Sequence, residues 1–322
     1  MSQCLLEINN VKKTYPIRTK NSLLFAPKQK LCALDHLSLK IYKGETYGLV
    51  GESGCGKSTI GRSILGLVKP DSGEILYNGV DLCQLSEKQF RSLRSELQMV
   101  FQNSLSALNP RSRIGDTLEE ILTVHGVSDP EKRREKVLAV LHTVGLSDEH
   151  YFRFPHELSG GQVQRLGIAC AIIIHPSLIV CDEPVSALDV SIQAQILNLL
   201  VSLKKDYELS LLFISHDISV VRFISDRIGV MYLGTLVEEA ETEELFSSPL
   251  HPYTQALFSS IPDVHAKNQD FRPLNGEQIT RTEEFAGCPF YNRCPHADDQ
   301  CRTSTPTLKE VRPGHKAACL KI

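Results

Sequence analysis

The hydrophobic residues of this chain follow strand and helix periods in turn. Alternating apolar positions predict half-exposed strands at residues 5–11 and 37–41. Further along, residues 192–203 carry apolar side chains at helical spacing, and residues 211–215 are a candidate buried strand. Helical and strand segments that alternate in this way predict an α/β fold with a largely parallel core sheet.

A helical insertion is predicted at about residues 103–170. Asp129 and Pro130 have the character of an N-cap followed by proline at the first helical position, and Gly145 is placed to end the helix. The helix is expected to bury one face, formed by Val137, Leu138, Leu141 and Val144. A second helical segment is predicted around residues 117–124.

After about residue 249 the periodic pattern gives way to prolines, short polar turns and clustered cysteines. Single hydrophobic cores stop growing at roughly 250–300 residues, and this chain has 322. We therefore expect one large domain at residues 1–250 and a C-terminal extension at residues 251–322.

Composition and charge exclude several classes of protein. With 42% hydrophobic and 23% charged residues and a net charge of -3, the chain is that of an ordinary globular protein, and we expect no nucleic-acid partner. Its longest apolar run, residues 166–181, is interrupted by His175 and Pro176 and is too short to span a bilayer. Without a secretory signal, a cytosolic location is expected, where ten cysteines remain reduced. Residues 16–30 are basic and are either a solvated insertion or a contact with a partner or acidic lipid.

A phosphate-binding loop is predicted between the apolar run at residues 46–50 and a helical pattern from residue 57 to about residue 67. The sequence between them fits G-x-x-x-x-G-K-[ST] in full, and its residues are Gly51, Glu52, Ser53, Gly54, Cys55, Gly56, Lys57, Ser58 and Thr59. Its glycines permit the tight backbone course that points N–H groups at phosphate oxygens. Lys57 is expected to reach the β and γ phosphates, and Ser58 to bind Mg²⁺.

Two carboxylates follow another apolar strand, at residues 178–183. The carboxyl ends of strands in an open α/β sheet face the ligand crevice. Asp182 is therefore expected to hold Mg²⁺, and Glu183 to orient or deprotonate the attacking water.

A second anion site is predicted at the start of a helix. Ser159 is a typical N-cap, and Gly160, Gly161 and Gln162 follow it. The glycines expose backbone N–H groups at the positive end of the helix. One chain thus carries two phosphate-binding helix starts.

Together these motifs resemble the ATP-binding subunits of ABC transporters. The resemblance implies a P-loop NTPase fold with an antiparallel β subdomain, and ATP and Mg²⁺ as ligands. It also implies that Tyr15 stacks on adenine and that His216 contacts the γ-phosphate. Gln102 would belong to the loop that links nucleotide and Mg²⁺ to the membrane partner, and Asp189 to the nucleotide interface. In this family two subunits pair head to tail, so each chain supplies half of each composite ATP site.

The C-terminal extension resembles that of ATPase subunits of oligopeptide and dipeptide importers. The resemblance is carried by residues 249–254, by Ile261-Pro262 and by residues 288–295. The insertion at residues 16–30 and the run at residues 182–195 further resemble the second of the two ATPase subunits of such systems. It implies a heterodimer with another ATPase, two transmembrane permease subunits and an extracytoplasmic substrate-binding protein. The chain would be peripheral, on the cytoplasmic side of the inner membrane. Importers of nickel, glutathione or antimicrobial peptides share much of this pattern, and a soluble ABC ATPase is the remaining alternative.

Four of the ten cysteines lie in the extension: Cys288, Cys294, Cys301 and Cys319. Their spacing is not the paired C-x-x-C of a zinc ribbon. Three alternatives stay open. The resemblance implies a [4Fe–4S] cluster on these four thiolates; a zinc site would use His296 or His315 as well; or the thiols are free.

Overall fold

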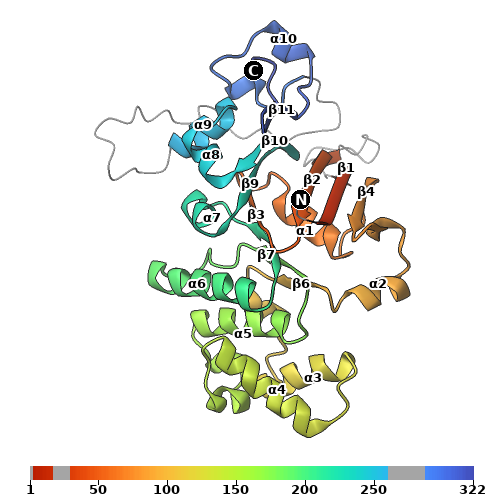
Figure 1. The fold of residues 1–322 in the computed structure, drawn as a ribbon, viewed down its shortest axis with the longest axis vertical. Coiled ribbons are helices and arrows are strands. Elements are labelled where there is room, and N and C mark those ends of the chain that lie inside the picture. The colour runs from red at the N-terminus through yellow and green to blue at the C-terminus, as the bar shows by residue number, and fades with distance from the viewer. Residues whose placement is uncertain (1–2, 17–29, 260–286) are drawn as a thin grey trace, which may run out of the picture. The chain divides into compact units, whose positions relative to one another are not determined.

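The computed structural model describes residues 3–16, 30–259 and 287–322 (Figure 1). Most of the basic segment and the Ile261-Pro262 pair of the extension lie outside the described residues. The chain forms two compact units. The first unit contains Met1–Tyr42, Thr46–Gln84 and His216–Ile322, and the second contains Lys43–Glu45 and Leu85–Ser215.

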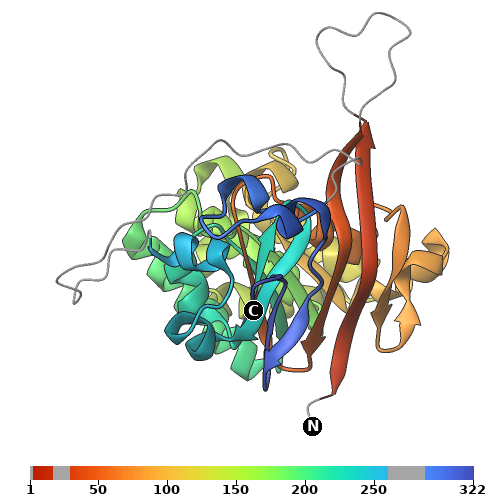
Figure 2. The ribbon, with the colours of Figure 1, turned by 90° about the horizontal axis from the view of Figure 1, so that it is seen from above.

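An antiparallel sheet forms the amino-terminal part of the first unit. Its strands are β1 (Cys4–Pro16), β2 (Lys30–Tyr42), β4 (Ser72–Tyr77) and β5 (Val80–Asp81), in the order β2-β1-β4-β5. The two long strands β1 and β2 lie side by side (Figure 2), with Ile8 opposite Leu39. The predicted strands at residues 5–11 and 37–41 are confirmed, and the antiparallel subdomain with them.

The second sheet of the first unit is mixed. The strand β3 (Thr46–Val50) pairs in parallel with β9 (Arg227–Tyr232), and β10 (Thr235–Glu241) is antiparallel to β9. The C-terminal extension adds β12 (His315–Ala317) to the free edge of β10, and β11 (Lys309–Arg312) to β12. The extension is therefore part of this sheet, which its lack of hydrophobic periodicity did not predict.

Short helices complete the first unit. They are α1 (Lys57–Ile64), α7 (Ile218–Ile224), α8 (Thr242–Ser247), α9 (Pro252–Ser259) and α10 (Asp299–Thr303), with 3₁₀ turns η1 (Leu82–Gln84) and η5 (Tyr291–Arg293). Because α1 follows β3 through the glycine-rich loop, the unit begins its core with the strand, loop and helix that the sequence predicts.

Three parallel strands form the centre of the second unit: β6 (Leu97–Val100), β7 (Leu178–Asp182) and β8 (Ser210–Ile214). All residues of β7 and β8 are buried. The helices are α2 (Glu87–Leu93), α3 (Ile114–Val124), α4 (Pro130–Thr143), α5 (Gly160–Ile172) and α6 (Val190–Asp206), with 3₁₀ turns η2 (Ser104–Ala107), η3 (Asp148–Phe152) and η4 (Pro155–Glu157). The parallel core and the helical insertion confirm the predicted fold class.

The helix α4 begins and ends as the sequence predicts, but its buried face differs by one position. Asp129 caps it by accepting the Glu131 N–H at 3.0 Å, and Gly145 follows it at φ 75°. Val140 is buried where Leu138 was expected, and Leu138 is half-buried. Positions 137, 140, 141 and 144 form one helical stripe, whereas position 138 is turned about 100° from position 137.

No helix in the described ranges is both long enough and apolar enough to cross a membrane.

Candidate nucleotide site

The loop between β3 and α1 has a backbone course that only glycine tolerates at two positions. Gly51 and Gly56 have φ values of 153° and 108°. A Cβ on Gly51 would lie 2.2 Å from the Met231 carbonyl oxygen, and a Cβ on Gly56 would lie 2.2 Å from that of Ala33. Gly54 is also in the left-handed region, at φ 78°. The loop is therefore pressed against β9 and β2, with its remaining side free to follow a phosphate chain.

Lys57 is buried inside this loop. Its Nζ donates hydrogen bonds to the carbonyl oxygens of Gly51, at 2.7 Å, and of Glu52, at 3.0 Å. Burial raises the pKa of the neighbouring Cys55 thiol, so this group stays uncharged beside the ammonium. The two carbonyl oxygens thus hold the Lys57 ammonium inside the loop, and a cation at this position would attract a bound phosphate.

Of the other predicted residues, Ser53 lies in the loop, and Ser58 and Thr59 lie in the first turn of α1. Ser53 is exposed, while Ser58 and Thr59 are half-buried. The first N–H groups of a helix have no intrahelical acceptor and carry a partial positive charge. The loop and the start of α1 can therefore bind an anion together.

Tyr15 and His216 also belong to the first unit. Tyr15 is half-buried near the end of β1, opposite Leu31 of β2, with the Lys13 Nζ 5.6 Å from its ring centre. This is the strand pair that contacts the loop through Ala33. His216 is exposed and follows the strand β8, one residue before Asp217, whose Oδ1 caps α7 by accepting the Ser219 N–H at 2.9 Å.

In the second unit, Glu183 is held by its backbone and by Gln102. Its φ of 49° lies in the left-handed region, which costs a residue with a side chain about 1 kcal/mol or more. Its N–H donates to the Ile214 carbonyl of β8 at 2.9 Å. Gln102 Nε2 donates to Glu183 Oε2 at 3.0 Å. A strained backbone and the Gln102 donor, which also reaches Ser186 Oγ at 3.4 Å, hold this half-buried carboxylate in place, and such strain is common at functional sites.

The predicted Mg²⁺ ligands are chemically suitable. Asp182 ends β7 and is only 5% exposed. Because the Gln102 amide donates through Nε2, its Oε1 remains an acceptor. Taken one by one, the predicted ligands are a carboxylate on Asp182, an amide oxygen on Gln102 and a hydroxyl on Ser58, and Mg²⁺ prefers oxygen ligands of these kinds.

The serine–glycine segment forms the start of α5 as predicted. Ser159 and Gln162 make a reciprocal capping box: Ser159 Oγ accepts the Gln162 N–H at 3.4 Å, and Gln162 Oε1 accepts the Ser159 N–H at 3.0 Å. Gly160 is exposed, and a Cβ on Gly161 would lie 2.6 Å from Ile192 Cγ2 of α6. Asp189 is exposed at the N-cap of α6. Two helix N-termini thus lie beside each other in the second unit.

A buried hydrogen bond between the segment after Gln102 and α5 was not predicted from the sequence. Ser104 Oγ donates to Gln164 Oε1 at 3.0 Å, and both side chains are buried. A Cβ on Gly167 would lie 2.3 Å from Ser104 Oγ. A glycine inside a helical pattern is the one signal that could have indicated this close approach.

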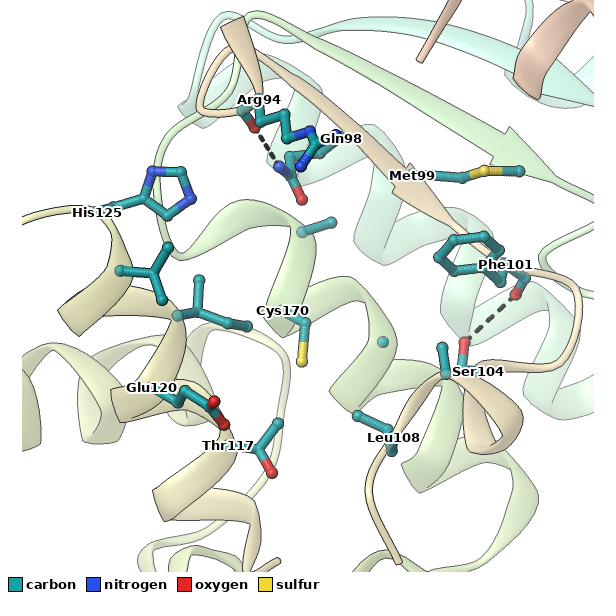
Figure 3. Close-up of a pocket in the computed structure, with 15 residues that line it drawn as sticks. Arg94, Gln98, Met99, Phe101, Ser104, Leu108, Thr117, Glu120, His125 and Cys170 are labelled. Carbon is teal, nitrogen blue, oxygen red and sulfur yellow. Dashed lines mark hydrogen bonds between the residues drawn. The ribbon is translucent and has the colours of Figure 1, made fainter. Parts of the chain in front are cut away.

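An open groove of about 440 Å³ lies beside this link in the second unit (Figure 3). Thr117 and Glu120 of α3 line one side, and Ser104 and Leu108 the other, with Cys170 of α5 between them. Two apolar side chains at its rim, Phe101 and Val124, are 38% and 75% exposed. Exposed apolar side chains around a groove are typical of a surface that binds another protein.

The four C-terminal cysteines lie near one another, but the described structure does not support the predicted cluster site. Cys288 donates its N–H to the Cys301 carbonyl at 2.8 Å. Burial and the nearby thiols of Cys301, Cys294 and Cys319 raise the pKa of Cys288 to about 11. Residues 3–16, 30–259 and 287–322 contain no group of three or more His, Cys, Asp or Glu side chains that could hold a metal ion.

The proposed zinc alternative also meets an obstacle at His315. This side chain is fully buried, and its two ring nitrogens lie 2.8 Å from Glu238 Oε1 and 3.2 Å from Glu244 Oε1. Both nitrogens are therefore engaged by carboxylates. The described structure supports neither the iron–sulphur nor the zinc prediction.

The fold and this site define the chain as an ABC-type ATPase. Residues 34–186 match the family described as ABC transporter, and residues 237–301 match the family described as oligopeptide/dipeptide transporter, C-terminal region. The structure of the dimeric ATP-binding cassette MJ0796 bound to ADP and Pi is similar, with a TM-score of 0.65 and 29% identity, over 74% of this chain and 99% of that one.

Longer similarity extends through the C-terminal extension. The chain is 48% identical to the oligopeptide transport ATP-binding protein AppF of Bacillus subtilis, over 98% of this chain and 97% of that protein. It is 46% identical to the oligopeptide transport ATP-binding protein OppF of Escherichia coli, over 99% and 96%. The chain belongs to the family of oligopeptide transport ATP-binding proteins, as its motifs predicted.

Proposed function

We propose that this chain binds and hydrolyses ATP to energise import of peptides, as a peripheral subunit on the cytoplasmic side of the cell inner membrane. The observation that carries the proposal is the hydrogen bond from Gln102 to Glu183 beside an open groove. A partner that moves the segment around Gln102 would move the donor that orients the Glu183 carboxylate. Transport and hydrolysis would thus be coupled through one hydrogen bond.

In the proposed reaction, the loop from Gly51 to Thr59 wraps the phosphates, and Tyr15 stacks on adenine. Lys57 leaves the loop carbonyls to contact the β and γ phosphates. Glu183 takes a proton from the attacking water, and His216 contacts the γ-phosphate. Mg²⁺, held by Ser58, Asp182 and Gln102, would supply charge stabilisation at the transferring group.

The second anion site needs a second ATPase subunit. Ser159 Oγ is already engaged within its capping box, and the N–H groups of exposed Gly160 and half-buried Gly161 are those proposed to receive a phosphate. We propose that they close over ATP bound to the partner, together with Asp189. In this proposal the subunits form a heterodimer, residues 1–250 act as the ATP-binding domain, and residues 251–322 as its extension.

The groove is the proposed contact with a permease. Its size and apolar rim suit one apolar face of a short cytoplasmic helix, and Phe101 at the rim is the neighbour of Gln102 in the chain. Val124→Glu should therefore reduce assembly with the permease subunits. Val201→Glu on α6, which changes another exposed valine outside the groove, should not. Equal assembly by the two variants would remove the groove from the proposal.

The proposed substrate is tested by assembling the chain with its two permeases and its extracytoplasmic binding protein in proteoliposomes. ATP hydrolysis should rise when the binding protein is loaded with an oligopeptide. Stimulation by nickel, glutathione or an antimicrobial peptide alone would assign the transporter to one of the related importers instead. Hydrolysis without any permease at the full rate would favour a soluble ATPase.

For the C-terminal cysteines we propose free thiols packed in the extension. Two observations support this alternative: the described residues contain no group of three or more side chains that could hold a metal ion, and His315 is engaged by two carboxylates. Protein purified without oxygen should be colourless near 400 nm and contain neither iron nor zinc. Four thiol-bound irons per chain would restore the [4Fe–4S] cluster as a cofactor.

A further inference from the structure

Glu52 is the second residue of the phosphate loop, and three of its groups form hydrogen bonds: the carboxylate, the backbone N–H and the backbone carbonyl. Its carboxylate accepts two hydrogen bonds from Arg293, with Nη1 to Oε2 at 2.8 Å and Nη2 to Oε1 at 2.9 Å. Its backbone N–H donates to Tyr253 Oη at 2.9 Å. Its carbonyl accepts from Lys57 Nζ at 3.0 Å. Arg293 and Tyr253 both belong to the C-terminal extension. The extension therefore contacts the loop at Glu52, the residue whose carbonyl also accepts a hydrogen bond from Lys57.

The side chains of Arg293 and Tyr253 are themselves held by their surroundings. Arg293 is 6% exposed and Glu52 21%, so little water screens the pair. The guanidinium also lies 5.9 Å from the Tyr232 ring centre. Tyr253 is fully buried, and its ring packs against Tyr232 and Phe290, with ring centres 4.6 and 5.5 Å apart. Two parallel hydrogen bonds from a planar guanidinium fix orientation as well as distance.

The phosphate-loop motif does not explain the contacts of Glu52 with Arg293 and Tyr253. The phosphate-loop motif leaves its second position unspecified, and the extension lies outside the residues that bind nucleotide by motif. A buried, bidentate ion pair between the two is costly in desolvation unless its geometry is well satisfied. Here both carboxylate oxygens and both terminal guanidinium nitrogens are paired.

We propose that Arg293 and Tyr253 are positioning residues of the nucleotide site, through which the C-terminal extension holds the phosphate loop in the conformation that receives ATP. The inference rests on the proposed ATP-binding function and extends it to residues that no nucleotide motif contains. Neither residue touches the phosphates. Each acts through Glu52, and so through the carbonyl that directs Lys57.

The physical effect is preorganisation. A glycine-rich loop that is free to move must lose conformational entropy when ATP binds, and that loss weakens binding. A loop already fixed at Glu52 avoids most of it. Loss of the Arg293 and Tyr253 contacts with Glu52 should therefore weaken ATP binding and raise KM, while kcat at saturating ATP stays near that of the wild-type chain.

The test measures ATP affinity of the full-length chain and KM and kcat of the assembled transporter. Arg293→Met should weaken ATP binding roughly tenfold, which corresponds to about 1.4 kcal/mol. Tyr253→Phe, which removes a single hydroxyl, should weaken it by a smaller factor. Arg302→Met is the matched control, because Arg302 is an exposed arginine of the same extension, on α10, and it should bind ATP as the wild-type chain does.

A second variant keeps the test decisive if Arg293→Met folds poorly. Arg293→Lys retains the charge but loses the paired geometry, so its affinity should fall between those of wild type and Arg293→Met. Glu52→Gln should resemble Arg293→Lys, and combining it with Arg293→Met should add little to the loss from Arg293→Met alone. Full additivity of the two losses would show that the residues act independently and would overturn the inference.

Other results also overturn it. Wild-type affinity in folded Arg293→Met would do so, as would a fall in kcat with KM unchanged. Failure of the proposed function is distinguishable from both, because in that case the wild-type chain itself would not bind ATP.

Discussion

Glu238→Ala should loosen the C-terminal extension from the first unit more than any surface change nearby. Glu238 lies on β10 and is fully buried. Its Oε1 accepts the Leu250 N–H at 2.6 Å, and its Oε2 accepts the His251 N–H at 2.9 Å. His315 Nε2 of β12 lies 2.8 Å from Oε1. One carboxylate therefore joins the chain that leads into α9 to the last strand of the extension.

The size of the effect follows from what the substitution leaves behind. The N–H groups of half-buried Leu250 and buried His251 lose their acceptor, at about 1–3 kcal/mol each, and the buried His315 loses one of its two carboxylate partners. Together these losses amount to about 3–5 kcal/mol. For a unit of about 150–250 residues, each kcal/mol shifts Tm by roughly 2–4 °C. Glu238→Ala should lower Tm by about 10 °C.

Urea and thermal unfolding followed by circular dichroism measure this loss. The control is Glu244→Ala, which removes another carboxylate that contacts His315 but is 41% exposed. Water screens the exposed Glu244 carboxylate, so the control should lose at most a few degrees. Hydrogen exchange at the amides of Leu250 and His251 should accelerate only in Glu238→Ala. Equal losses of stability in the two variants would refute the anchoring role assigned to Glu238.

Lys57→Ala should abolish most ATP binding in equilibrium assays, because the ammonium held by the loop is the charge that meets the phosphates; near-normal affinity would contradict its role. Gly167→Ala should cost about 1–3 kcal/mol in urea unfolding, because its Cβ would lie 2.3 Å from Ser104 Oγ, and Ser104→Gly in the same chain should recover part of the loss. Burial lowers the pKa of His251 from 6.5 to about 4. The neutral ring therefore contributes to the free energy of unfolding above pH 6.5, and this contribution should fall by up to about 3 kcal/mol as the pH falls toward 4. His251→Asn, which retains an acceptor for the Tyr253 N–H, should flatten the dependence of unfolding free energy on pH; an unchanged slope would count against this origin.

The parts of the site that the sequence predicts are those whose physical cause is local. The tight course at Gly51 and Gly56 is imposed within a few residues, and so is the capping box between Ser159 and Gln162. Such features can be predicted from a few consecutive residues, because a turn or a cap involves only near neighbours along the chain. The same holds for the start and end of α4.

The parts that escaped prediction depend on contacts between distant residues. Arg293 and Glu52 are 241 positions apart, and His315 and Glu238 are 77 apart. No periodicity marks either pair, because each residue is polar within a turn-rich or strand-edge segment. The iron–sulphur prediction is a different case, because the described residues contain no group of three or more side chains that could hold a metal ion. Cysteines clustered in the sequence indicate which thiols could share a site, but metal binding also depends on how their side chains are arranged around the ion.

The central claim is that Glu183, oriented by Gln102, is the base of a transport-coupled ATPase. The most direct measurement is phosphate release by the complete transporter carrying Glu183→Gln, with peptide-loaded binding protein and saturating ATP. The variant should bind ATP with wild-type affinity and retain it, while phosphate release falls by roughly 10²–10⁴-fold, the range for loss of a general base. Phosphate release at a rate close to that of the wild-type transporter would contradict the account.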